Sequence, residues 1–110
     1  LSEDDKIRQH ATQQIRSYFK LDFKNFNEQF NINFNEYFSN EIKFLDELEK
    51  DGLVEIKEES ILVTEIGRDF VQNIMNIFDK FDPPTKSYKD RLETVRKAKK
   101  AQAAVQDQIS

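Results

Sequence analysis

The sequence predicts a mostly α-helical domain with a small β-hairpin, arranged as a winged-helix-like unit. Apolar residues recur at helical spacings of three and four up to residue 50. The period then changes to strand-like alternation, and a second helical stripe follows until two consecutive prolines. This order of periods predicts three helices, a two-stranded wing and a fourth helix.

Composition bounds the size of the domain and excludes several kinds of site. A chain of 110 residues fits one domain, and ten Phe with three Tyr predict an aromatic-rich core. With no Cys there are no disulfides or thiolate metal ligands, and a single His builds no histidine cluster. The only glycines, Gly52 and Gly67, form no phosphate-binding loop.

Two helices are expected in the N-terminal part of the chain. Ser2 and the acidic residues after it suit a helix N-terminus, and the helix is expected to run from Ser2 to Phe19. Asp22 is the candidate N-cap of a second, shorter helix with an aromatic face. The residues of that face are Phe23, Phe26 and Phe30.

A third helix is expected from Asn33 to Lys50. Asn33 is a candidate cap with Glu36 three residues later, and Gly52 suits a left-handed position after the helix ends. The apolar stripe comprises Tyr37, Phe38, Ile42, Leu45 and Leu48.

The hairpin and the fourth helix follow. Alternation over residues 53–57 and the apolar run 61–63 predict two strands around an acidic turn. Thr64 is the expected cap of a helix that extends toward Asp82, where Pro83 and Pro84 end it.

The C-terminal stretch differs in composition, so we divide the chain into a winged-helix-like domain (residues 1–82) and a basic tail (83–110). Residues 85–110 hold seven Lys or Arg against three Asp or Glu, a net charge of +4. The whole chain has a net charge of −4, which leaves −8 on residues 1–84. The tail is rich in Ala, Lys and Gln but has few apolar residues, so a helical or disordered tail that buries little surface is expected.

Charge weighs against nucleic-acid binding. Many winged helices place their third helix in the DNA major groove. Here residues 35–52 carry six acidic and two basic side chains, and Glu58 with Glu59 makes the wing turn acidic as well. A phosphate backbone would repel this surface. The alternative that stays open is a winged-helix interaction module, which binds protein or, through its basic tail, nucleic acid.

No catalytic, cofactor-binding or metal-ligating residue is expected. His10 has no evident partner in the sequence, and paired carboxylates such as Glu58 and Glu59 favour a solvated turn. No apolar stretch is long enough to span a membrane, and a cytoplasmic location is expected. Because the chain starts at Leu1 without Met, we expect a fragment of a longer polypeptide.

Several ordered motifs carry a resemblance to a known family. They are Leu1-Ser2-Glu3-Asp4-Asp5-Lys6-Ile7-Arg8, Phe19-Lys20-Leu21-Asp22-Phe23, Phe34-Asn35-Glu36-Tyr37-Phe38, Asp51-Gly52-Leu53-Val54-Glu55, Ile61-Leu62-Val63-Thr64, Gly67-Arg68, Asn73-Ile74-Met75 and Phe78-Asp79. In this order they resemble the C-terminal domain of the oxygen-independent coproporphyrinogen III oxidase family over residues 1–81. The stretch from residue 83 onward has no counterpart in this resemblance.

The resemblance implies a radical S-adenosylmethionine enzyme of haem biosynthesis as parent. Such a parent converts two propionate side chains of coproporphyrinogen III to vinyl groups, using a 4Fe–4S cluster held by three cysteines and S-adenosylmethionine. Without cysteine this fragment is expected to bind neither cofactor, but to close the substrate cleft of the parent's catalytic barrel. A related haem-trafficking homologue stays open as the parent.

The same resemblance suggests which residues meet substrate. Arg8, Lys20 and Arg68 are the candidate cations for propionates, with Asn73 as a hydrogen-bonding neighbour. The alternative for each is a surface or salt-bridged residue. The sequence also departs from the family's pattern, because Gln9 and Gln72 stand where arginines are usual and Ser17-Tyr18 replaces a Cys-Asn pair.

Overall fold

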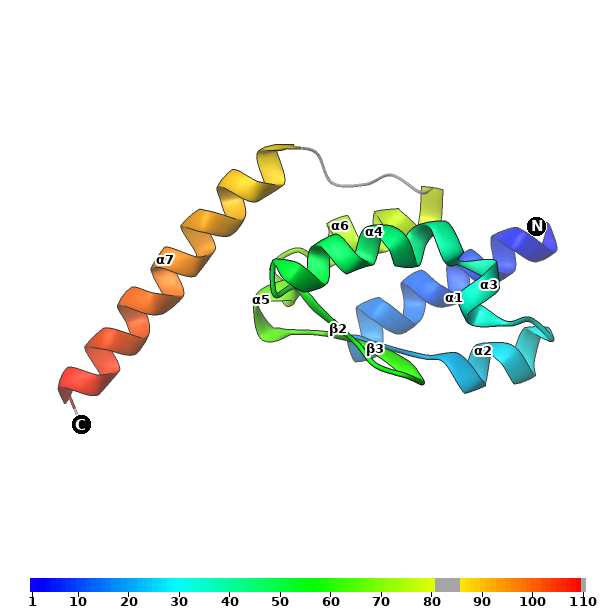
Figure 1. Cartoon of the computed structure of the whole chain (residues 1–110), viewed down its shortest axis with the longest axis horizontal. Helices are drawn as coiled ribbons and strands as arrows, with labels where there is room; N and C mark the ends of the chain where they lie inside the picture. The colour runs from blue at the N-terminus through cyan, green and yellow to red at the C-terminus, as the bar shows by residue number, and fades with distance from the viewer. Residues whose placement is uncertain (81–85, 110) are drawn as a thin grey trace.

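The structure is a computed structural model that describes the backbone of residues 1–80 and 86–109 and the side chains of 1–79 and 89–101. Its elements are α1 (Glu3–Tyr18), β1 (Lys20–Asp22), α2 (Phe23–Phe30), α3 (Phe34–Tyr37), α4 (Ser39–Lys50), β2 (Val54–Ile56), β3 (Ser60–Val63), α5 (Glu65–Arg68), α6 (Val71–Lys80) and α7 (Lys86–Ile109) (Figure 1). They confirm the predicted fold class. The expected helix end at Phe81–Asp82, the two prolines and the boundary after residue 82 lie outside the described residues.

The predicted hairpin is present, and it belongs to a larger sheet than expected. β2 pairs antiparallel with β3, with Val54 opposite Val63. A third strand, β1, pairs with the other edge of β3, so that the strand order is β1-β3-β2. In β1 only Leu21 is buried. A strand of three residues is too short for its alternation to be recognised in the sequence. Its pairing with β3 makes it a strand.

The expected N-caps are all formed. The side chains of Ser2, Asp22, Asn33 and Thr64 accept hydrogen bonds from the backbone N–H three residues later, at 3.0 to 3.3 Å. Gly52 has the expected left-handed conformation, with φ at +81°. Its N–H donates to Glu49 O, and the next N–H donates to Leu48 O, which closes the end of α4.

Two of the predicted helices are each divided in two. The expected helix from residue 33 to residue 50 breaks at Phe38, whose φ of −104° and ψ of 32° separate α3 from α4. The helix expected after Thr64 is divided into α5 and α6 at Asp69 and Phe70. Phe38 and Phe70 are both fully buried, so the apolar period continues through each break and hides it from a pattern search.

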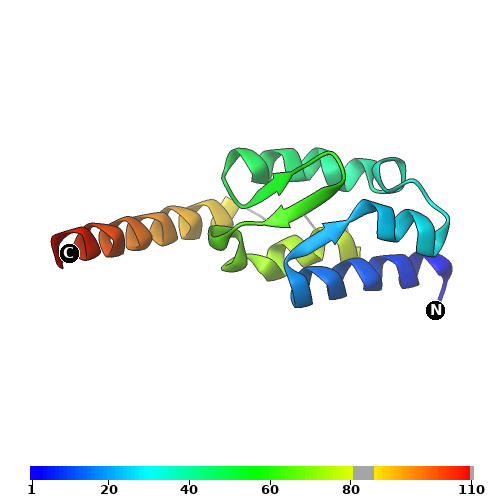
Figure 2. The same ribbon diagram turned by 90° about the horizontal axis from the view of Figure 1, so that it is seen from below.

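The core lies between the helices and the sheet. Helix α1 packs along α6, and α4 lies on the opposite side of the molecule (Figure 2). Phenylalanine rings fill the interior as the composition predicts, and those of Phe23 and Phe34 stack with centroids 4.4 Å apart. The fully buried phenylalanines are Phe26, Phe34, Phe38, Phe70 and Phe78.

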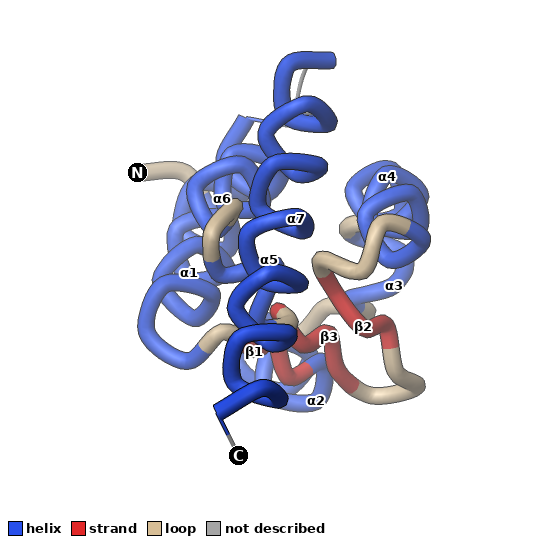
Figure 3. Tube along the Cα trace, turned by 90° about the vertical axis from the view of Figure 1, so that its left-hand side faces the viewer, coloured by secondary structure: helices blue, strands red, loops and turns tan. Residues whose placement is uncertain are grey.

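The tail forms α7, which is helical as one of the two expectations allowed. It lies against the end of the domain where α5 lies, and its C-terminal turns extend away from the body (Figures 1 and 3). Among the described side chains of α7, Leu92 departs from the expectation that the tail buries little surface. Leu92 is only 3% exposed and joins the core, because α5 and the start of α6 leave an apolar site open at this end.

No helix in the described ranges, 1–80 and 86–109, is both long and apolar enough to cross a membrane.

The corner where α4, β2 and α5 meet depends on close backbone contact. The carbonyl of Leu53 accepts a hydrogen bond from Thr64 N–H at 3.0 Å, and the Thr64 hydroxyl donates to Gly52 O. Gly67 in α5 lies directly over Leu53. A Cβ atom at Gly67 would lie 1.9 Å from the Leu53 carbonyl oxygen, which leaves room for no other residue.

Gly67→Ala is therefore expected to lower the free energy of unfolding by about 3 kcal/mol, since the added methyl group must displace backbone atoms. Urea unfolding followed by circular dichroism measures this change. Gly52→Ala is the matched control, because a Cβ there has its nearest neighbour at 3.7 Å and costs only the left-handed strain of about 1 kcal/mol. Equal urea midpoints for the two variants would contradict the close contact.

Candidate functional site

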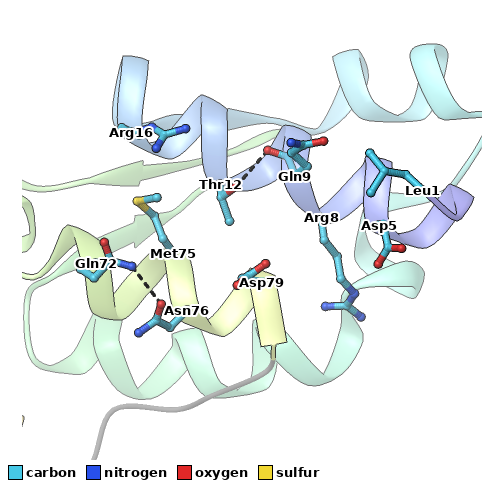
Figure 4. A pocket seen from close by; sticks show the side chains of 10 residues that line it. All are labelled: Leu1, Asp5, Arg8, Gln9, Thr12, Arg16, Gln72, Met75, Asn76 and Asp79. Atoms are coloured by element: carbon cyan, nitrogen blue, oxygen red, sulfur yellow. Dashed lines mark hydrogen bonds between the residues drawn. The ribbon is translucent and has the colours of Figure 1, made fainter.

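A groove of about 500 Å³ lies between α1 and α6 (Figure 4). From α1 it is lined by Arg8, Gln9, Thr12 and Arg16. From α6 it is lined by Gln72, Met75, Asn76 and Asp79. The groove exists because α1 and α6 bury their apolar faces together and leave their polar edges facing one another.

Arg8, a predicted substrate contact, holds three helices together at one end of this groove. Its Nη1 donates to the Phe78 carbonyl of α6 at 2.9 Å and lies 3.3 Å from the Glu41 carboxylate of α4. Its Nε pairs with Asp4 at 2.9 Å. Burial opposes the charge of Arg8, but the hydrogen bonds and charges of Asp4 and Glu41 outweigh it and raise the pKa of Arg8.

The network continues to Tyr37, which was expected only as part of a helix stripe. The Tyr37 hydroxyl donates a hydrogen bond to Asp4. This bond is the main reason why the pKa of Asp4 lies below its ordinary value of 3.8. Partial burial and the hydrogen bond to Asp4 raise the pKa of Tyr37 to about 12. Asp4 is thus held ionised and Tyr37 protonated, which fixes α1 to the end of α3.

Sequence reasoning missed the role of Glu41. We counted it among the acidic residues of the third helix that would repel a phosphate backbone, but it is 4% exposed and faces Arg8. One signal could have found it. Glu41 lies three and four residues from Phe38 and Leu45, both fully buried, and therefore shares their apolar face. A carboxylate on such a face requires a cationic partner.

The groove is close to charge balance. Arg8 and Arg16 face Asp5 and Asp79, and the charge of Arg8 is further met by Asp4 and Glu41. The other polar lining consists of amides and a hydroxyl, with Gln72 donating to Asn76 at 3.0 Å (Figure 4). Gln9 and Gln72, the two positions that depart from the resemblance, both line it. The surface suits neutral hydrogen-bonding partners better than a polyanion.

The other three candidate residues do not lie with Arg8. The guanidinium of Arg68 stacks on the Phe19 ring at 4.4 Å, and Lys20 is exposed on the adjoining strand β1. Eleven positions of α1 and its cap separate Arg8 from Phe19, about 16 Å along a helix axis. Asn73 accepts a hydrogen bond from Arg91 of α7 at 3.3 Å. The structure therefore places Arg68 on Phe19, separates Arg8 from it along α1, and gives Asn73 a partner on α7.

His10 has structural partners. Its Nε2 lies 3.2 Å from the Asn25 amide oxygen, and its ring packs edge-on against Phe26 and Phe30. Within residues 1–79 and 89–101, no three His, Asp or Glu side chains are grouped so as to hold a metal ion. His10 is thus part of the packing between α1 and α2.

Comparison with known families gives a match over most of the domain. The model of the HemN C-terminal domain matches residues 1–70. The oxygen-independent coproporphyrinogen III oxidase of Salmonella typhimurium is 40% identical over 81 residues, which is 74% of this chain and 18% of that protein. The enzyme of the same name from Escherichia coli K12 is 37% identical over 81 residues, with the same coverage. The chain thus spans less than a fifth of these relatives.

A solved structure has the same fold. It is described as "Coproporphyrinogen III oxidase (HemN) from Escherichia coli is a Radical SAM enzyme". The superposition has a TM-score of 0.71 at 37% identity and covers 74% of this chain and 19% of the other.

Removing Arg8 is expected to destabilise the fold strongly. Arg8→Ala leaves the buried Glu41 carboxylate unpaired, which costs about 3 kcal/mol. A second change, Glu41→Gln, is expected to recover part of the loss because it removes the unpaired charge. Urea unfolding of both variants measures these values. The control is Lys43→Ala, which removes an exposed cation of α4. If Arg8→Ala lowers the free energy of unfolding no more than Lys43→Ala does, the role of Arg8 is contradicted.

The Tyr37–Asp4 bond is expected to make stability depend on pH at both extremes. The depressed pKa of Asp4 stabilises the fold above pH 3.8, and this contribution is lost as the pH falls through the lower folded value. The raised pKa of Tyr37 stabilises the fold below pH 10.0, and this contribution is lost as the pH rises toward about 12.

Thermal unfolding of the wild type and Tyr37→Phe as a function of pH measures both effects. The stability difference between the two proteins should be constant near neutral pH and shrink in both acid and alkali. A difference independent of pH would show that the bond does not form.

Proposed function

The chain belongs to the HemN C-terminal domain family, and on this basis we propose that it is the non-catalytic C-terminal domain of an oxygen-independent coproporphyrinogen III oxidase. The observation that carries the proposal is the 40% identity over 81 residues with such an enzyme. In the parent polypeptide, two propionate side chains of coproporphyrinogen III are oxidatively decarboxylated to vinyl groups in haem biosynthesis. The preceding part of the polypeptide performs that reaction.

The reaction is assigned to another part of the polypeptide because of the ligands that a radical S-adenosylmethionine enzyme requires. Its 4Fe–4S cluster is held by cysteine thiolates, and the chain contains no cysteine. The residues of this domain therefore do not fit the cluster, and the catalytic barrel must supply its ligands. We assign no step of the reaction to this domain.

We propose that the domain covers the substrate cleft of the catalytic barrel. Exclusion of water protects reactive intermediates and strengthens the electrostatic interactions that hold a charged substrate. Two features support this role: a rigid body braced by Arg8, and the polar groove between α1 and α6, which offers hydrogen bonds to an adjoining protein surface. The catalytic barrel is the partner that this surface is proposed to meet.

Among the candidate substrate contacts, Lys20 and Arg68 are the two that we retain for the propionates. Both are exposed, and the described residues give neither of them an ion pair. Arg8 is a positioning residue in this proposal because its guanidinium already pairs with Asp4 and Glu41. Asn73 has the Arg91 guanidinium as a partner, so it reaches substrate only if that contact opens.

A winged-helix interaction module is the alternative, and charge weighs against its nucleic-acid form. Helix α4 presents a mainly acidic surface. The cations that would make the tail attractive to phosphates include Arg91, Arg96 and Lys99, which contact carbonyl or carboxylate oxygens of the chain itself. Protein binding is compatible with both the oxidase-domain proposal and the interaction-module alternative. The catalytic turnover of the full-length polypeptide distinguishes the two.

The test uses the full-length polypeptide that contains this domain, assayed without oxygen for conversion of coproporphyrinogen III to the divinyl product. Arg68→Ala is expected to raise KM about tenfold with little change in kcat, because it removes one charge-assisted hydrogen bond to a propionate. Lys43→Ala on α4 is the matched control. Absence of any decarboxylation by the wild type would refute the proposed function, whereas an unchanged KM in Arg68→Ala would remove only Arg68 from the site.

A further inference from the structure

The C-terminal helix α7 occupies a defined site on the domain. It lies beyond residues 1–70, the part that the family model matches. Leu92 inserts into the core at 3% exposure, and Val95, one turn later, packs partly buried beside it. A helix that only projected into solvent would bury neither side chain.

Arg91 makes the most specific contact of this site. Its guanidinium lies 4.3 Å from the centroid of the Phe70 ring, within the range of a cation–π interaction. The same group donates to the Asp69 carbonyl at 3.0 Å and to the Asn73 amide oxygen at 3.3 Å. Asp69 is the C-cap of α5, so Arg91 bonds a carbonyl at a negative helix end.

A second set of contacts repeats this pattern at the end of α4. Arg96 donates to the carbonyl of Asp51, the C-cap of α4, and Lys89 Nζ lies 3.9 Å from the Asp51 carboxylate. Lys99 Nζ lies between the carboxylates of Glu65 and Asp69, at 3.7 and 3.8 Å. The contacts of α7 therefore converge on two helix C-termini.

We propose that this corner is a recognition surface for a basic amphipathic helix, and that α7 occupies it in cis. The surface combines an aromatic ring, two helix-end carbonyls, three carboxylates and an apolar site. A matching helix needs Arg, Leu, Val, Arg and Lys at the relative positions of residues 91, 92, 95, 96 and 99, which fall on one helix face. Lys97 and Lys100 are exposed and take no part.

Because most of these contacts are ionic or charge-assisted, the docking of α7 depends on ionic strength. At about 1 M salt the Debye length falls to about 3 Å, and exposed ion pairs such as those of Lys89 and Lys99 are screened. Release of α7 also removes the Arg91 guanidinium from Asn73. The surface is thereby opened to another basic helix. This inference does not rest on the proposed enzymatic role.

Hydrogen–deuterium exchange on the full 110-residue chain tests the docking. In low salt the amides of residues 91–99 and of the corner around Asp51 and Asp69 are expected to be protected. Arg91→Ala with Arg96→Ala is expected to speed their exchange about tenfold, as is about 1 M salt, while α1 and α2 stay unchanged. Lys97→Ala with Lys100→Ala is the charge-matched control. Exchange that responds to neither the double substitution nor salt would overturn the ionic docking.

Recognition in trans is tested with a synthetic peptide of residues 86–109 added to the Arg91→Ala, Arg96→Ala chain. The wild-type peptide is expected to restore slow exchange at the corner, whereas the same peptide with both substitutions is not. Leu92→Ala is a second variant in which α7 is expected to be released. It removes the apolar contact of α7 and leaves its ionic contacts unchanged. Failure of the wild-type peptide to protect the corner in either chain would overturn the recognition surface.

Discussion

One guanidinium determines how the helices of this domain are held together. Arg8 extends from α1 to the carboxylate of Glu41 on α4 and to the last-turn carbonyl of Phe78 on α6. Because Glu41 is buried, its charge is tolerated only while Arg8 is present, and removal of either partner leaves an uncompensated group. The hydrogen bond to Phe78 adds to the apolar packing of α1 against α6 at one end of the groove between them.

The ion pairs of Arg8 with Asp4 and Glu41 also bear on the proposed function. A cation already paired with two carboxylates contributes little to the binding of a polyanionic substrate, so the groove beside Arg8 is better suited to contact protein. Among the candidate substrate contacts, Lys20 is exposed on β1, and Arg68 stacks on the Phe19 ring. The groove beside Arg8 and the site of Arg68 are thus separate, and the chain contains no cysteine.

At the other end of the domain, α7 adds a brace to the family's fold. The corner where Gly67 lies over Leu53 admits no side chain at residue 67, and backbone contacts and the Thr64 hydroxyl help to form it. Arg91 and Arg96 of α7 bond carbonyls on both sides of this corner. They meet carbonyls at the C-termini of two helices, so these two cations of the tail have partners in its own domain.

The sequence by itself determined the N-caps at Ser2, Asp22, Asn33 and Thr64, together with the hairpin, the aromatic core and the absence of thiolate ligands. These features depend on near neighbours in the chain, such as the Thr64 side chain and the N–H three residues later. Only the tertiary structure decided that β1 is a strand, that Glu41 is buried against Arg8, and that α7 docks through Leu92. Each of these depends on contact between segments far apart in the chain, where local periodicity carries no information.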